Sequence, residues 1–193
     1  MKILKSSRKT ARFAGILFLV AMVASLVGGG LLETTNVGRS DSLFITGIIL
    51  EIINALAVLG IGIILFPVLR NFQRNAAKMY LALRILEALA CLAAPLVLVI
   101  LTNGNDLRMF FTGKIIPLFF CIGAMVLYYI LYAYRLLPRF IAIWGFIGIT
   151  GIIVLNLVKI ETSVGMLLAL PIILNEIFLG FWLIAKGFNK TEN

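Results

Sequence analysis

Four ionisable residues lie inside long apolar stretches of this chain, where a charged side chain is energetically costly. They are Glu51, Arg84, Glu87 and Glu176. An ionised group at the centre of a bilayer costs about 2.5–3.5 kcal/mol, so such groups normally meet a partner or water and mark functional sites. A guanidinium group can anchor an anion, and a carboxyl group can take up or release a proton. These residues therefore predict ligand binding or proton linkage inside a membrane.

The spacing around Arg84 predicts a polar helix face. Tyr80, Arg84 and Glu87 are separated by four and then three residues, which places them on one side of a helix. Arg84 and Glu87 are expected to form an ion pair that reduces the cost of burying either residue. Glu51 and Asn54 repeat the three-residue spacing in the preceding apolar stretch, nearer the opposite membrane surface. A direct contact between Glu51 and Arg84 is therefore not expected.

The last apolar stretch carries a second polar group near its middle. Asn175 and Glu176 follow Pro171, which is expected to kink the helix. Glu176 is expected to be the partner of Arg84. The apolar stretches hold three carboxyl groups and one guanidinium group, so two acids are expected to lack a cation. Those acids are either protonated or face a hydrated cavity, and both options suggest proton linkage.

Several of these polar residues have a simpler interpretation as contacts between helices. Interhelical hydrogen bonds stabilise membrane bundles by about 0.6 kcal/mol each, and Asn54 and Asn175 are expected to act in this way. A contact of that kind needs no ionisable group, which favours a functional cavity for the acids and Arg84. Tyr128 and Tyr132 share another helical face. They either donate hydrogen bonds inward or belong to the aromatic belt at the membrane surface.

The composition identifies the elements that must position these side chains. The chain has 193 residues, of which 62% are hydrophobic and 13% charged, and its mean hydropathy is +1.12. These values are typical of an integral membrane protein. Apolar stretches of roughly the 20 residues needed to span a bilayer lie at residues 13–32, 43–69, 79–101, 115–134, 140–158 and 164–185. The sequence predicts an all-α bundle of six transmembrane helices, forming one membrane domain over residues 1–193.

Charged residues in the connecting segments predict the orientation of the bundle. Basic residues gather before the first span, between the second and third, and between the fourth and fifth: Lys2, Lys5, Arg8, Lys9, Arg12, Arg70, Arg74, Lys78, Arg135 and Arg139. In the alternate connections the charges balance: Glu33, Arg39, Asp41, Asp106, Arg108, Lys114, Lys159 and Glu161. The positive-inside rule then places both termini in the cytoplasm. Topology explains the net charge of +9, and no nucleic-acid partner is expected.

Two further features concern packing and the outer surface. Gly145, Gly148 and Gly151 in the fifth stretch mark positions where helices can approach closely. The segment 102–114 is expected to lie at the membrane interface, where it would cap a cavity.

The sequence lacks the residues of most enzymes. It has no histidine, which removes the usual haem and zinc sites and the Ser-His and Cys-His dyads. Its two cysteines, Cys91 and Cys121, form no CxxC motif. No metal site, cofactor or catalytic motif is predicted. Acid–base chemistry by Glu87 and Glu176 is the one enzymatic interpretation left, and no motif supports it.

Short patterns along the chain are typical of one family. They are Arg84-Ile-Leu-Glu87, Leu137-Pro138-Arg139-Phe140, and Asn175-Glu176 followed by Trp182 and Lys186-Gly187, with Arg12 to Leu19 as the opening. In these patterns the chain resembles the domain of unknown function 4386 family of small bacterial multi-pass membrane proteins. The resemblance implies six spans in a bacterial cytoplasmic membrane and gives extra weight to Arg84, Glu87 and Glu176. It implies no chemistry.

Two hypotheses of function follow. In the first, a polar cavity within the membrane binds or moves a small molecule, a lipid or a proton. Its candidate residues are Arg84, Glu87, Glu176, Glu51, Asn54, Asn175, Tyr80 and Tyr128. In the second, the protein is a structural or regulatory subunit that acts through helix contacts with another membrane protein. Expected partners are membrane lipid, a small-molecule ligand, and either a second copy or another membrane protein.

Overall fold

The computed structural model describes residues 2–33, 41–101, 103–158 and 162–189, and within these ranges every regular element is helical. The elements are α1 (Lys2–Glu33), α2 (Ser42–Leu69), α3 (Arg74–Ile100), α4 (Asn105–Phe110), the π-helical turn η1 (Phe111–Ile115), α5 (Ile116–Ala133), α6 (Arg139–Leu157) and α7 (Thr162–Ala185). Arg39, Lys159 and Glu161, which enter the predicted loop charges, lie outside the described residues.

The described part of the chain contains six helical stretches long and apolar enough to cross a membrane. The prediction of an all-α bundle with six spans is therefore confirmed. The fourth span differs from its predicted bounds, because α4, η1 and α5 form one continuous stretch, Asn105–Ala133, that starts well before residue 115. The expected interfacial segment 102–114 is thus largely the first part of a spanning helix.

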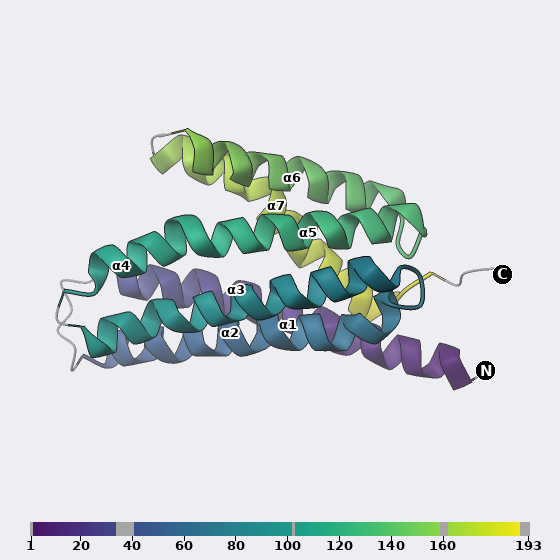
Figure 1. The fold of residues 1–193 in the computed structure, drawn as a ribbon, viewed down its shortest axis with the longest axis horizontal. Helices are drawn as coiled ribbons and strands as arrows, with labels where there is room; N and C mark the ends of the chain where they lie inside the picture. Colours follow the sequence, from purple (N-terminus) through teal and green to yellow (C-terminus); the bar gives the residue numbers. More distant parts are fainter. Residues whose placement is uncertain (1, 34–40, 102, 159–161, 190–193) are drawn as a thin grey trace.

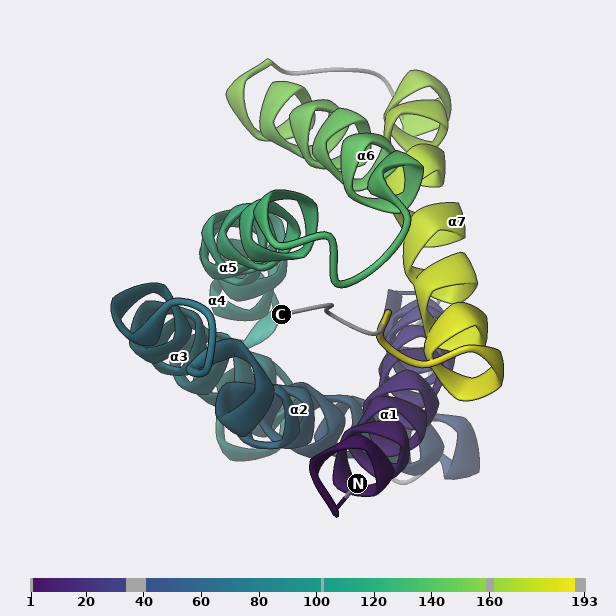
Figure 2. The same cartoon turned by 90° about the vertical axis from the view of Figure 1, so that its right-hand side faces the viewer.

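The helices form a closed ring in chain order. Each span packs on the next one along the chain, and α7 returns to pack on α1, as the end-on view in Figure 2 shows. The start of α1 and the end of α7 lie at the same end of the bundle (Figure 1). Large apolar side chains such as Phe13, Leu56, Leu89 and Phe181 are exposed on the outside. This surface implies contact with lipid, and the ring leaves one face of each helix for a shared interior.

Glycines let α6 approach its neighbours closely. A Cβ atom at Gly148 would lie 2.7 Å from the Cα atom of Ile172 on α7, and one at Gly145 would overlap the ring of Tyr128 on α5. Gly151 meets the backbone of Leu168 in the same way. The predicted role of these three glycines in close packing is confirmed.

Apolar side chains close the interior at the end that holds the termini. The residues of this apolar plug are Phe18, Leu65, Leu69, Leu127, Leu131, Leu137, Leu179, Leu183 and Phe188. They leave a space of only about 10 Å³ between them. Asn189 crosses this end, since its backbone N–H donates to the carbonyl of Leu136 at 2.8 Å. Apolar packing therefore leaves little room at this end of the interior.

Candidate functional site

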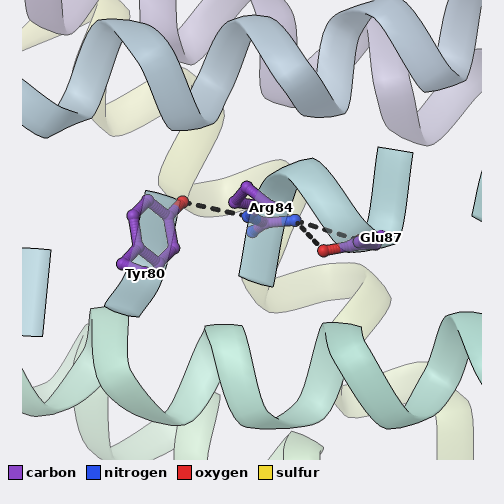
Figure 3. Close-up of polar contacts among 3 residues, drawn as sticks. All are labelled: Tyr80, Arg84 and Glu87. Atoms are coloured by element: carbon purple, nitrogen blue, oxygen red, sulfur yellow. Dashed lines mark hydrogen bonds and ion pairs between the residues drawn. The ribbon is translucent and has the colours of Figure 1, made fainter. Parts of the chain in front are cut away.

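The polar face predicted for α3 points into the ring (Figure 3). The Arg84 Nε–H donates to the Tyr80 hydroxyl at 3.1 Å, and Nη1 donates to both carboxylate oxygens of Glu87 at 3.1 and 3.0 Å. All three residues are buried, and Arg84 is only 2% exposed. The expected ion pair between Arg84 and Glu87 is present, and the Tyr80 hydroxyl accepts a further hydrogen bond from Arg84.

Aromatic rings surround the Arg84 guanidinium group. Its central carbon lies 5.9 Å from the ring centroids of Phe18 and Phe120 and 5.4 Å from that of Tyr80. Rings at this distance attract a cation electrostatically. Arg84 Nη2 is buried and has no hydrogen-bond partner among the described residues. The group is thus held firmly while one donor stays unused.

The prediction that Glu176 pairs with Arg84 is wrong. Arg84 is already bonded to Tyr80 and Glu87, which are one helical turn away on its own helix. Glu176, on α7, lines the same pocket as Arg84 and Glu87. It forms no hydrogen bond or ion pair with any residue that the structure describes. Arg84 can bond groups on its own helix without any change in helix packing, which explains why it bonds Tyr80 and Glu87 rather than Glu176.

The prediction that two acids lack a cation is also wrong, because Arg108 enters the bundle. Arg108 Nη2 lies 2.6 Å from Glu51 Oε1, and the two residues are 5% and 8% exposed. The sequence predicts an interfacial segment around Arg108 and does not predict this pair. Glu51 Oε2 and Arg108 Nε are both buried without a partner in the described structure. Of the three acids Glu51, Glu87 and Glu176, only Glu176 forms no ion pair with a described residue.

The π-helical turn η1 explains how Arg108 reaches the interior. The N–H of Ile116 bonds to the carbonyl of Phe111, five residues earlier, so the helix face shifts relative to that of α5. Arg108, Thr112 and Ile116, spaced by four residues, then line one pocket. The spacing of four residues is the sequence signal for this shared face. The predicted fourth span begins only at residue 115, however, and so leaves Arg108 outside it. Met109, the neighbour of Arg108, is 67% exposed.

Tyr128 and Asn175 join three helices. The Tyr128 hydroxyl donates to Asn175 Oδ1 at 2.5 Å, and Asn175 Nδ2 donates to the carbonyl of Ile141 on α6 at 2.9 Å. Tyr128 therefore points inward, whereas Tyr132 is 37% exposed and packs its ring against Arg139. These bonds between α5, α6 and α7 confirm the interhelical contact expected of Asn175.

Two adjoining pockets lie inside the ring. The inner pocket has a volume of about 240 Å³, and its polar lining comprises Ser25, Asn54, Arg84, Glu87, Cys91 and Glu176. The rest of its lining is mainly apolar and comes from all six spans. The outer pocket, about 180 Å³, lies further from the termini and is lined by Ser25, Gly29, Glu33, Glu51, Asn54, Cys91, Ala94, Arg108, Thr112 and Ile116. Ser25, Asn54, Cys91 and Ile116 line both pockets, so the two spaces adjoin and share these side chains.

Comparison with known proteins yields one family. A family model with the description Domain of unknown function (DUF4386) matches residues 13–187, which includes part or all of every span. No curated protein and no solved structure matches the chain significantly.

Proposed function

Because the chain belongs to the family described as Domain of unknown function (DUF4386), whose description assigns no activity, we propose a function from the site alone. The protein is a multi-pass protein of the bacterial cytoplasmic membrane that binds a small, largely apolar molecule in the inner pocket. Arg84, Glu87 and Glu176 supply the polar contacts.

The inner pocket is the observation that carries this proposal. Protein interiors are normally close-packed, so helices that only support one another would fill a space of about 240 Å³. Apolar walls with a few convergent polar groups are typical of small-molecule sites. Two groups in this pocket have bonding capacity left, Glu176 and the Nη2 donor of Arg84. A bound polar group can satisfy either of them: Glu176 by donating to its carboxyl group, or Nη2 by accepting from it.

Exposed basic residues support the proposed orientation. Arg8, Arg12, Arg70, Arg74 and Arg135 are exposed and belong to the segments at the end that holds the termini. The positive-inside rule assigns this end to the cytoplasm. The outer pocket then opens toward the opposite side of the membrane.

A pocket-filling substitution tests the proposal. Ala21 lines the inner pocket, so Ala21→Phe should fill it, while Ala133→Phe adds the same bulk at an exposed position. Thermal unfolding in detergent is measured with phenethylamine, phenethyl alcohol and phenylacetate, which share one ring. At least one probe should raise the unfolding temperature of the wild type and of Ala133→Phe, but not of Ala21→Phe. If none stabilises the wild type, ligand binding in this pocket is rejected.

The second candidate is a structural or regulatory subunit that contacts another membrane protein. The bonds of Tyr128 and Asn175 favour it, since they fix helix packing without facing a ligand. Glu176→Gln separates the two candidates. Glu176 has no described bond to lose, so both candidates predict no loss of stability. A purely structural role predicts an unchanged response to every probe, whereas the binding site predicts an altered response.

A further inference from the structure

We propose that the ligand is a small organic cation, which enters through the outer pocket and binds with its charged group at Glu176. This inference rests on the proposed function and adds the ligand class and its route. It follows from three features of the two pockets: their charges, the side chains they share and their aromatic walls.

Carboxyl groups outnumber guanidinium groups along the two pockets. The charged residues of their described lining are Glu33, Glu51, Glu87, Glu176, Arg84 and Arg108. Both guanidinium groups already have carboxylate partners, Glu87 and Glu51. Within the part of the chain that the structure describes, Glu33 at the rim and Glu176 at the bottom form no ion pair. Coulombic attraction is strong in a medium of low dielectric constant, so the partly buried Glu176 favours a cation over an anion. Glu33 is exposed and adds a weaker attraction that steers a cation toward the rim.

The outer pocket offers a route to the inner pocket from the end opposite the termini. The apolar plug leaves little space at the end that holds the termini, whereas the two pockets adjoin at Ser25, Asn54 and Cys91. Along this route Glu51 keeps one buried oxygen without a described partner. That oxygen can accept a hydrogen bond from an ammonium group that passes through the outer pocket.

The walls of the inner pocket suit an organic cation rather than a bare metal ion. Phe18 and Phe120 line it, and ring faces attract alkylammonium groups. Hard metal ions require six or more oxygen ligands, and the described residues contain no group of three or more Asp, Glu, His or Cys side chains that could hold a metal ion. The remaining Val, Ile and Pro side chains match an apolar ligand body.

Cys91 provides a natural reporter at the junction of the pockets. It lines both spaces, whereas Cys121 lines neither, so Cys121→Ser leaves a single reporting thiol. Trimethylammonioethyl and sulfonatoethyl methanethiosulfonate are matched cationic and anionic reagents. Each transfers its alkylthio group to the thiolate and releases methanesulfinate. The rate of each is divided by its rate with free mercaptoethanol.

The cationic reagent should modify Cys91 about tenfold faster than the anionic reagent on this normalised scale. Glu33→Gln should lower the ratio, and Asp106→Asn, which removes an exposed acid outside both linings, should not. A ratio of one or less, or no modification by either reagent, overturns the inference.

A second pair of variants tests the route. Gly29 lines the outer pocket, and a Cβ atom there would lie 4.0 Å from Glu51 Oε1. Gly29→Phe should therefore place an aromatic ring in the outer pocket and slow modification of Cys91 by about tenfold or more. That loss is as large as the smallest rate gain expected from charge in a narrow cleft, about tenfold. Gly30→Phe is the control, because a Cβ atom at Gly30 meets nothing within 4 Å. Equal rates in the two variants overturn the proposed route.

Ligand protection separates failure of this inference from failure of the proposed function. Phenethylamine should protect Cys91 from modification, and Glu176→Gln should weaken that protection. If only phenethyl alcohol or phenylacetate protects Cys91, the binding function stands and the cation is rejected. If no probe protects a reactive Cys91, the proposed function itself fails.

Discussion

Glu51 and Arg108 form an ion pair at 2.6 Å across 57 positions of the sequence, and the pair links α2 to α4 at the end opposite the termini. Both side chains are largely buried, and each keeps one buried polar atom without a described partner. The pair therefore serves two purposes. It neutralises two charges that would be costly alone, and it forms part of the outer pocket wall.

Removal of one partner from this pair should be strongly destabilising. Arg108→Gln leaves the Glu51 carboxylate buried without a cation, and loss of one member of a buried pair costs about 3–5 kcal/mol. The free energy of unfolding in detergent, measured by denaturant titration, should fall by that amount. The double variant Glu51→Gln, Arg108→Gln should recover much of the loss, because no unpaired charge remains. A double variant as unstable as Arg108→Gln would contradict the pairing.

The hydroxyl of Tyr80 should matter to stability although Tyr80 faces no solvent. Tyr80→Phe keeps the ring packing but leaves Arg84 Nε without its acceptor at 3.1 Å. A buried donor left unsatisfied costs about 1–3 kcal/mol. Tyr129→Phe is the matched control, since Tyr129 is 53% exposed. Equal unfolding midpoints for the two variants would show that the Tyr80 contact contributes nothing.

Sequence reasoning succeeded where the relevant contacts are local. Span length and hydropathy predicted six helices, and the three-residue spacing predicted the pair between Arg84 and Glu87. It failed for Arg108, whose partner is distant in sequence and whose orientation depends on the π-helical turn η1. A change of one residue in helical register redirects every side chain before it, and no hydropathy average reports such a change.

The same distinction explains the error at Glu176. Depth in the membrane made Glu176 and Arg84 candidates for a pair, and the structure does place both in the inner pocket. Depth does not decide which carboxylate a guanidinium group bonds, however. Glu87 lies on the same helix as Arg84, and its carboxylate can be reached without any rearrangement of the bundle. The unpaired state of Glu176 is thus a tertiary property that the sequence does not reveal.

The contact between Tyr128 and Asn175 should contribute to bundle stability rather than to ligand binding. Tyr128→Phe removes the donor to Asn175 Oδ1, and interhelical hydrogen bonds in membrane proteins contribute about 0.6–1.7 kcal/mol. Unfolding in detergent should report a loss in this range. Tyr132→Phe, at a partly exposed position outside both pocket linings, should change little. Probe binding should be the same in both variants, and a lost response in Tyr128→Phe alone would assign Tyr128 to the binding site instead.

Close packing between α6 and α7 predicts a sharp difference between two glycine substitutions. At Gly148 an added methyl group would press on the backbone of Ile172, 2.7 Å away, and backbone cannot move aside as a flexible side chain can. Gly148→Ala should therefore separate the helices or strain them, at a cost of about 1–3 kcal/mol. Gly30→Ala has open space, and alanine favours helix over glycine by about 0.5–1 kcal/mol. Denaturant unfolding should rank the variants Gly30→Ala, wild type and Gly148→Ala in falling order of stability.

Because Ile172 also lines the inner pocket, Gly148→Ala should weaken the response to phenethylamine as well. A Gly148→Ala protein as stable as the wild type would mean that α6 and α7 are free to move apart, and that the inner pocket does not have fixed walls.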